Sequence, residues 1–142
     1  MPISLPIADP CPFCDYLTGQ QPATILEQGQ HAAILVTAWQ RGQGHVLVIP
    51  VAHRATIMDV TPAEEQHLMS AVRRAAHAIA VAYDSGGIAV WQNNGVAAHQ
   101  KVPHAHFHVA GTLPGGGTRT GEVPRLDLGE TDRIAKRLSP HL

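Results

Sequence analysis

Apolar and polar positions along the chain predict a set of short strands around one long helix. Apolar runs at Thr24–Leu26 and His31–Thr37 flank the turn residues Gln28-Gly29-Gln30, a pattern typical of a β-hairpin. The β-branched run His45–Ile49 ends at Pro50, and we expect it to form a buried strand.

The strongest helical signal begins at Thr61. Thr61 and Glu64 have the spacing of a reciprocal capping box, and Pro62 would occupy the first helical position. Apolar residues then recur every three or four positions, as one buried stripe requires: Leu68, Val72, Ala75 or Ala76, Ile79 and Tyr83. The segment Asp84–Gly87 is expected to end this helix.

Shorter elements fill the rest of the chain and favour an α+β fold. They are a turn or short helix over residues 11–19 closed by Gly19, a strand over Gly87–Gln92, a turn at Asn93-Asn94-Gly95, a strand from Lys101 or Pro103 to Ala110, a flexible loop over Pro114–Thr120, and a final helix over Thr131–Leu138. The sum is an antiparallel sheet of about five strands with one long helix and short helices.

Composition indicates one domain spanning residues 1–142, long enough to bury a core. The formal net charge is −1, and no basic stripe favours nucleic acid or an anionic membrane as a partner. No apolar run approaches the roughly 20 residues of a membrane span, and Met1–Pro10 lacks the pattern of a signal peptide. We therefore expect a cytoplasmic protein.

Three histidines alternate with apolar residues near the end of the sheet-forming region. On a strand, His104, His106 and His108 would share one face, while the residues between and after them, Ala105, Phe107 and Val109, would enter the core. Three adjacent imidazoles repel one another when protonated, so a purely structural strand gains little from them. We expect them to act as a metal ligand, nucleophile or proton donor.

The two cysteines, Cys11 and Cys14, form a single CxxC pair. In a chain without an export signal such a pair indicates a metal site, a redox dithiol or two buried thiols. A thioredoxin-like CxxC follows a strand, and none is predicted before Cys11, which favours the metal site.

Four motifs together resemble the histidine triad family. They are Cys11-x-x-Cys14, the strand Gly44-His45-Val46-Leu47-Val48-Ile49-Pro50 followed by His53, the loop Asn93-Asn94-Gly95-x-x-Ala98-His99-Gln100, and His104-x-His106-x-His108-Val109. The resemblance covers a core over residues 11–110, and residues 111–142 form a loop and a C-terminal helix without a matching motif. It implies an α+β domain, usually a symmetric homodimer, that hydrolyses or transfers nucleoside monophosphates.

The resemblance also implies roles for individual residues. His106, the middle histidine, would attack the α-phosphorus and form a nucleotidyl-histidine, and His108 would donate to the phosphate or leaving group. Asn93 and Gln100 would stabilise charge on the phosphoryl oxygens, and His45 matches a further active-site histidine. The catalytic set is therefore His104, His106 and His108.

A zinc site is implied at the positions that hold zinc in some members of the family. Its ligands would be Cys11, Cys14, His53 and His104, a Cys2His2 set suited to tetrahedral coordination. A site closed by four protein ligands would be structural, and it would orient His106 through the shared strand. No organic cofactor is expected.

Three positions depart from the family pattern. Thr37 stands where an acidic residue often accepts the ribose hydroxyls, so sugar recognition at this position is weaker. His99 and Lys101 bring cationic groups to the phosphate loop, where they would favour a more anionic substrate or face solvent. We expect Trp39 and Trp91 to pack in the core or in loops.

Three function classes follow from these residues. The first is an enzyme acting through His106 on a phosphoramidate, an acyl-nucleotide or a dinucleoside polyphosphate. The second is a nucleotide-binding or scaffold protein with little turnover. The third is a hydrolase with a catalytic metal held by the three histidines; it is the weakest, because the outer histidines of one strand lie about 13 Å apart.

Overall fold

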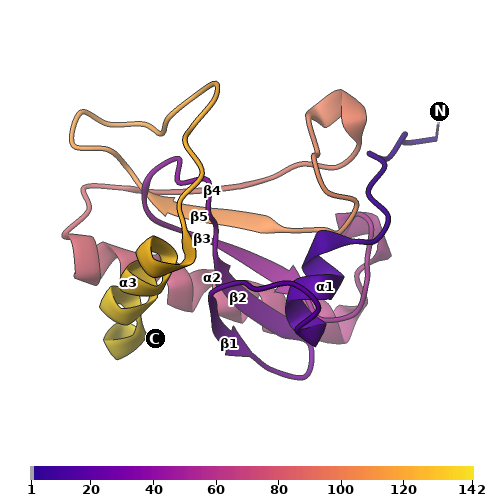
Figure 1. Cartoon of the computed structure of the whole chain (residues 1–142), viewed down its shortest axis with the longest axis horizontal. Coiled ribbons are helices and arrows are strands. Elements are labelled where there is room, and N and C mark those ends of the chain that lie inside the picture. Colours follow the sequence, from indigo (N-terminus) through magenta and orange to yellow (C-terminus); the bar gives the residue numbers. More distant parts are fainter. Residues whose placement is uncertain (1) are drawn as a thin grey trace.

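The computed structural model describes residues 2–142 and has the predicted α+β architecture (Figure 1). In chain order its helices and strands are α1 (Pro12–Thr18), β1 (Ile25–Gln28), β2 (Ala32–Val36), β3 (Gln43–Pro50), α2 (Pro62–Tyr83), β4 (Ile88–Gln92), β5 (Phe107–Gly111) and α3 (Leu128–Leu138). The five strands form one sheet in the order β1-β2-β3-β5-β4, and every neighbouring pair is antiparallel.

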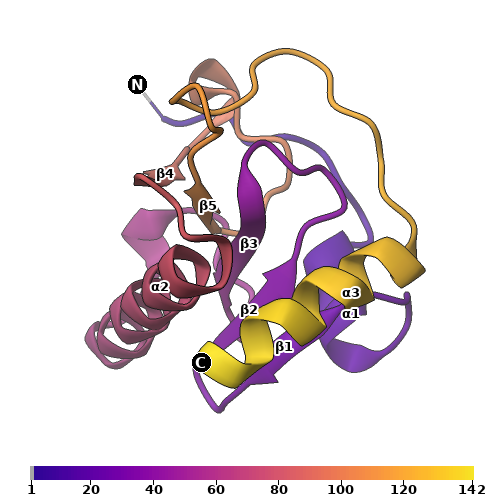
Figure 2. The same ribbon diagram turned by 90° about the vertical axis from the view of Figure 1, so that its left-hand side faces the viewer.

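Alternation along β2 and β3 places one apolar set on each face of the sheet. Ile34 and Val48 point to the face that packs on α2 and on the end of α3. Figure 2 shows both helices beside the sheet. Leu35 and Leu47 point to the opposite face, where Phe13 of α1 covers them. Because both faces are covered near α1 and α2, strands β2 and β3 are almost fully buried.

Helix α2 begins as predicted, but its capping box is only half formed. The Thr61 hydroxyl accepts from the Glu64 backbone N–H at 3.3 Å. The Glu64 carboxylate does not return to the Thr61 N–H; it accepts from the Thr61 hydroxyl at 3.0 Å and from the Arg54 guanidinium at 2.6 Å. The buried carboxylate is thus used to tie the preceding loop to the helix.

Two predicted boundaries are wrong for identifiable reasons. Strand β5 begins at Phe107, not at Lys101 or Pro103, because the Ala105 N–H bonds to the Arg54 carbonyl at 2.6 Å instead of to a strand. Helix α3 begins at Leu128, not at Thr131, because Asp127 and Glu130 form a capping box ahead of it.

Residues 112–127, which we call the strap, cross from β5 to α3 along the loop between β2 and β3 (Figure 1). The Arg119 N–H donates to the Arg41 carbonyl at 2.7 Å, and the Leu126 N–H donates to the Ala38 carbonyl at 2.8 Å. Within residues 2–142, no helix has both the length and the apolar character needed to cross a membrane.

Candidate active site and metal cluster

The three triad histidines do not share one strand face. His106 and His108 line a common cavity, whereas His104 is fully buried and contacts the two cysteines. The chain turns just before β5, since the His104 N–H donates to the Val102 carbonyl at 2.8 Å. The expectation of a single histidine face is therefore wrong for His104.

His106 presents a bare ring nitrogen. Its Nδ1 lies 2.7 Å from the His104 carbonyl oxygen. A carbonyl only accepts, so Nδ1 carries the proton and Nε2 keeps its lone pair. Burial lowers the pKa of His106, which keeps the ring neutral. A neutral imidazole with a fixed tautomer is the form required of a nucleophile.

His45 and His108 form a hydrogen-bonded pair, and a backbone N–H determines which nitrogen of each ring carries the proton. The Arg41 N–H donates to His45 Nδ1 at 3.0 Å, so His45 carries its proton on Nε2. That nitrogen lies 3.0 Å from His108 Nδ1 and donates to it, which leaves the His108 proton on Nε2. Burial lowers the pKa of both rings to about 3, so the pair is neutral.

Gln40 holds the loop that supplies this backbone donor. Its Nε2 donates to the carbonyls of Thr37 and His45 at 2.7 and 2.8 Å, and its Oε1 accepts from the His45 N–H at 2.9 Å. Gln40 was not anticipated from the sequence, because a polar residue in a loop carries no periodic or motif signal.

Both tryptophans line the cavity instead of serving only as packing residues. Trp91 pairs with His108 across β4 and β5, and the two rings stack 4.7 Å apart with an interplanar angle of 4°. Trp39 is 45% exposed and lies on the loop after β2. Trp91 lies beside His108 because of the register between β4 and β5, and the sequence alone does not reveal that register.

The other predicted substrate-binding residues also line this cavity. Thr37 is buried, and its hydroxyl oxygen accepts from the Trp39 N–H at 3.1 Å. Gln100 is fully engaged with the backbone: its Oε1 accepts from the Gly95 N–H at 2.6 Å, and its Nε2 donates to two carbonyls at 2.8 Å. Asn93 and His99 flank this anchored loop.

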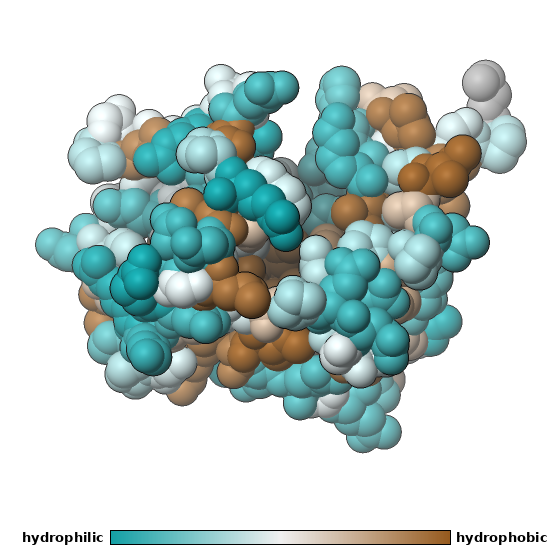
Figure 3. Space-filling model, in the orientation of Figure 1, coloured by the Kyte–Doolittle hydropathy of each residue, from teal (hydrophilic) through white to brown (hydrophobic). Residues whose placement is uncertain are grey.

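The cavity has a volume of about 1940 Å³. In Figure 3 the molecule is hollowed at its centre, with hydrophobic residues at depth and hydrophilic residues around the mouth. The strap forms one wall and the loop over residues 93–101 forms another. The C-terminal region, which carried no usable motif, thus contributes directly to the site.

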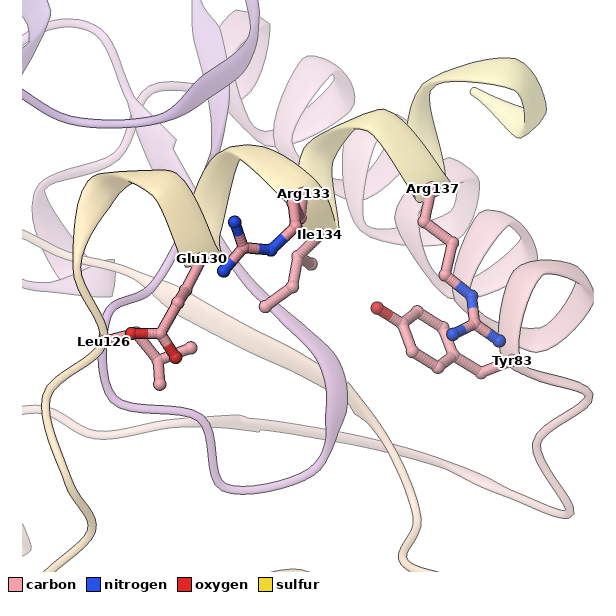
Figure 4. Close-up of a pocket in the computed structure, with 6 residues that line it drawn as sticks. All are labelled: Tyr83, Leu126, Glu130, Arg133, Ile134 and Arg137. Carbon is pink, nitrogen blue, oxygen red and sulfur yellow. The ribbon is translucent and has the colours of Figure 1, made fainter.

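A second hollow, of about 400 Å³, lies beside α3 (Figure 4). Its lining residues are Tyr83, Leu126, Glu130, Arg133, Ile134 and Arg137. The Arg137 guanidinium lies 4.0 Å from the centre of the Tyr83 ring, and no histidine reaches this space. His106 and His108 line the larger cavity instead, and we therefore place the candidate active site there.

The four predicted metal ligands form one cluster, with their donor atoms within 4.8 Å of one another. His104 Nε2 donates to the Pro50 carbonyl at 2.8 Å, so its Nδ1 is a free lone pair, 3.5 and 3.6 Å from the Cys11 and Cys14 sulfurs. His53 Nδ1 lies 3.3 Å from the Cys14 sulfur. A tetrahedral zinc site requires sulfur–nitrogen edges of about 3.6 Å, which these distances match.

Without a cation the cluster would stay protonated at Cys14. Burial, with a smaller contribution from the Cys11 thiol, raises the pKa of Cys14 to about 11. A bound divalent ion would displace this proton and stabilise the thiolate. The residues present therefore fit a metal ion, and the set has no open position for catalysis.

The chain matches the HIT domain family model over residues 18–114. It therefore belongs to the HIT domain family, as the four sequence motifs predicted.

An uncharacterized HIT-like protein of Mycobacterium tuberculosis is 39% identical over 105 residues, covering 70% of this chain and 69% of that protein. An adenosine 5′-monophosphoramidase of Saccharomyces cerevisiae is 29% identical, covering 86% and 73%. The crystal structure of a zinc-bound histidine triad family protein from Mycobacterium smegmatis superposes with a TM-score of 0.80 at 25% identity, covering 93% and 92%.

Proposed function

We propose that this chain cleaves nucleoside monophosphate derivatives at the α-phosphorus through a nucleotidyl-histidine on His106. The carrying observation is the bare Nε2 of a buried, neutral His106, held in that tautomer by the His104 carbonyl. In support, the relatives include proteins named adenosine 5′-monophosphoramidase from two yeasts and one named adenylylsulfatase from Arabidopsis thaliana.

The reaction has two displacements at phosphorus. In the first, His106 Nε2 forms a bond to the α-phosphorus, and the leaving group departs with the electron pair of the bond that breaks. In the second, water attacks the nucleotidyl-histidine and loses a proton to the solvent, the phosphorus–nitrogen bond breaks, and the nucleoside monophosphate is released with neutral His106 restored. The positive charge on the modified ring faces the His104 carbonyl oxygen, which stabilises it.

His108 supports the departing atom in this scheme. The Arg41 N–H donates to His45, and His45 donates to His108 Nδ1, so the proton of His108 lies on Nε2. The His108 ring lines the cavity. A preorganised N–H at this position hydrogen-bonds to the oxygen or nitrogen that leaves. Trp91, stacked on the ring, fixes its plane.

We also propose that Cys11, Cys14, His53 and His104 hold zinc. The ion supplies a structural crosslink between α1 and the segment before β5. The contribution of His104 to the chemistry is made by its backbone carbonyl, which contacts His106, while its ring serves the cluster. The same residue therefore joins the two sites.

The test is hydrolysis of adenosine and guanosine 5′-phosphoramidates by the wild type and by His106→Ala, with intact-mass detection of an adduct after an alkaline denaturing quench, because a phosphorus–nitrogen bond to histidine hydrolyses in acid. We expect a nucleotidyl adduct on the wild type and a loss of kcat of about 10³-fold or more in the variant. His77→Ala, an exposed histidine on α2, is the matched control and should keep wild-type turnover.

The result also separates the enzyme from a nucleotide-binding or scaffold protein. Bound nucleotide with neither turnover nor adduct would favour the binding protein. Near-normal activity of His106→Ala would remove the covalent mechanism.

A further inference from the structure

The strap is bound to the loop after β2 by two arginines that contact each other's backbone. The Arg119 N–H donates to the Arg41 carbonyl at 2.7 Å, and the Arg41 guanidinium donates to the Arg119 carbonyl at 3.1 Å. The Arg119 guanidinium also donates to the Gln40 carbonyl at 3.1 Å. The family match ends at residue 114, so Arg119 belongs to a part of the chain that carries no family motif.

The Gln40 carbonyl and the Arg41 N–H are the two ends of one peptide group, which we call the 40–41 peptide. Its oxygen accepts from the Arg119 guanidinium, and its N–H donates to His45 Nδ1 at 3.0 Å. Because a peptide group is planar, a contact that fixes the direction of the oxygen also fixes the direction of the N–H. Arg119 therefore orients the donor that decides which nitrogen of His45 carries the proton.

The hydrogen bonds that begin at Arg119 all run in the same direction. The guanidinium donates to the 40–41 peptide, the peptide donates to His45 Nδ1, and His45 Nε2 donates to His108 Nδ1 at 3.0 Å. Hydrogen bonds arranged head to tail polarise one another, so a cation at the first donor strengthens the last donor. That last donor is Nε2 of His108, whose ring lines the cavity.

The positive charge of Arg119 is not neutralised by a carboxylate. Two ion pairs form within residues 2–142, and neither includes Arg119. Its side chain contacts neutral carbonyl oxygen instead, which leaves the guanidinium charge to act on the 40–41 peptide. The other arginine of the strap, Arg125, lies over the Trp39 ring at 5.6 Å from its centre. The strap thus offers a second arginine of equal charge and different contacts.

We propose that Arg119 is a positioning residue: through the 40–41 peptide and His45, it strengthens the hydrogen bond that His108 gives to the leaving atom. The inference rests on the proposed function. In the first displacement of an ester, His106 Nε2 bonds to the α-phosphorus, the bond to the leaving oxygen breaks, and its electron pair departs on that oxygen. The His108 N–H binds the negative charge that develops there, and no proton moves along the chain of hydrogen bonds.

The effect of such a donor depends on the leaving group. A strongly basic oxygen holds its negative charge tightly as it departs, so it gains much from a strong N–H donor. A weakly basic oxygen departs with little help. Loss of the Arg119 guanidinium should therefore slow the departure of poor leaving groups more than that of good ones, whereas a merely loosened strap would slow both alike.

The experiment measures kcat for the phenyl ester and the para-nitrophenyl ester of adenosine 5′-monophosphate, of which phenolate is the more basic leaving group. Arg119→Met should lower kcat roughly tenfold for the phenyl ester and about twofold for the nitrophenyl ester. Arg119→Lys keeps a positively charged donor for a single carbonyl and should restore most of the loss. Arg125→Met removes an equal charge from the strap and should leave the ratio of the two kcat values unchanged.

A second measurement follows the hydrogen bond itself and needs no turnover. The NMR coupling between the Arg41 amide nitrogen and His45 Nδ1, which is transmitted across their hydrogen bond, should shrink in Arg119→Met. It should recover in Arg119→Lys and persist in Arg125→Met. A strap that acts only as a wall of the cavity would leave this coupling unchanged in all three variants.

The outcomes distinguish the two proposals. Equal losses of kcat for both esters in Arg119→Met, or an unchanged coupling between Arg41 and His45, would overturn the positioning role. A rise in KM alone would assign Arg119 to ligand binding and would overturn it as well. If the wild type cleaves the phosphoramidates but neither ester, the inference fails and the proposed function stands. If the wild type cleaves none of these compounds and forms no adduct, the proposed function itself fails.

Discussion

The three triad histidines are chemically identical, and their different roles follow from the partner of one ring nitrogen. His104 donates to the Pro50 carbonyl and turns its bare nitrogen to the cysteines. His106 donates to the His104 carbonyl, which frees the opposite nitrogen for attack. His108 accepts from His45 and therefore carries its proton on Nε2. Motif spacing singled out these three residues as candidates, but the tautomers depend on carbonyls and N–H groups that only the folded backbone brings together.

Gln40 should control the protonated nitrogen of His108 without touching it. In Gln40→Met the loop loses three hydrogen bonds, so the Arg41 N–H is no longer held on His45 Nδ1. We expect mixed tautomers at both histidines and a fall in kcat of about 10- to 100-fold, with a smaller change in KM.

Nitrogen-15 NMR of the imidazoles is the deciding measurement, because a merely loosened fold would not change the tautomer. Gln66→Met, an exposed substitution on α2, is the control. Wild-type imidazole signals in Gln40→Met would show that the loop does not set the tautomer.

At the scale of elements, periodicity predicted the sheet and the long helix, because those elements bury one regular face. It did not predict that β5 starts at Phe107 or that α3 starts at Leu128, since hydrogen bonds to the Arg54 carbonyl and to the Asp127 carboxylate set these limits. The strap has no periodic pattern at all, being rich in glycine and polar residues. Its place beside the cavity is a product of tertiary contacts with the loop after β2.

The short helix α1 contacts the rest of the protein partly through Cys11 and Cys14, which lie against His53 and His104 in the proposed zinc site. Cys11→Ser removes one of the two thiolates, and an alcohol is a poor ligand for zinc. We expect bound zinc to fall below half an equivalent and the free energy of unfolding to drop by about 2–4 kcal/mol.

Metal analysis and thermal melting of the same sample measure both quantities. Wild type treated with a chelator should reproduce the melting temperature of the variant, which separates loss of the metal from loss of the side chain. Full metal content with unchanged stability in Cys11→Ser would exclude Cys11 as a ligand.

At the scale of the whole molecule, stability should depend on pH through the buried histidines. The pKa of His45 and of His108 is about 3 in the folded protein, against about 6.5 in the unfolded chain. The unfolded chain therefore binds more protons between these values, and the free energy of unfolding decreases as the pH falls from about 6.5 towards 3. Above that window the two groups add no slope.

Each of these histidines contributes a slope of up to about 1.4 kcal/mol per pH unit. Denaturant titrations at pH 7, 6, 5 and 4 measure it, and His108→Asn should show a shallower decline because one titrating group is gone. Equal stability of the wild type at pH 7 and pH 4 would contradict the assigned burial.

The assembly of the molecule stays a prediction. Strands β1 and β4 form the two edges of the sheet, and Val90 on β4 is 49% exposed. The resemblance implies a homodimer, but the sequence pattern contains no recognisable dimer interface from which a dimer could be predicted independently.

The location of the aromatic side chains has a practical consequence. Trp39 and Trp91 are the two tryptophans of the chain, and both line the cavity. The indole emission of the unmodified protein therefore arises entirely from rings beside the site. A nucleotide that enters would quench or shift that emission, so occupancy can be followed in real time, without a dye and before any bond is broken.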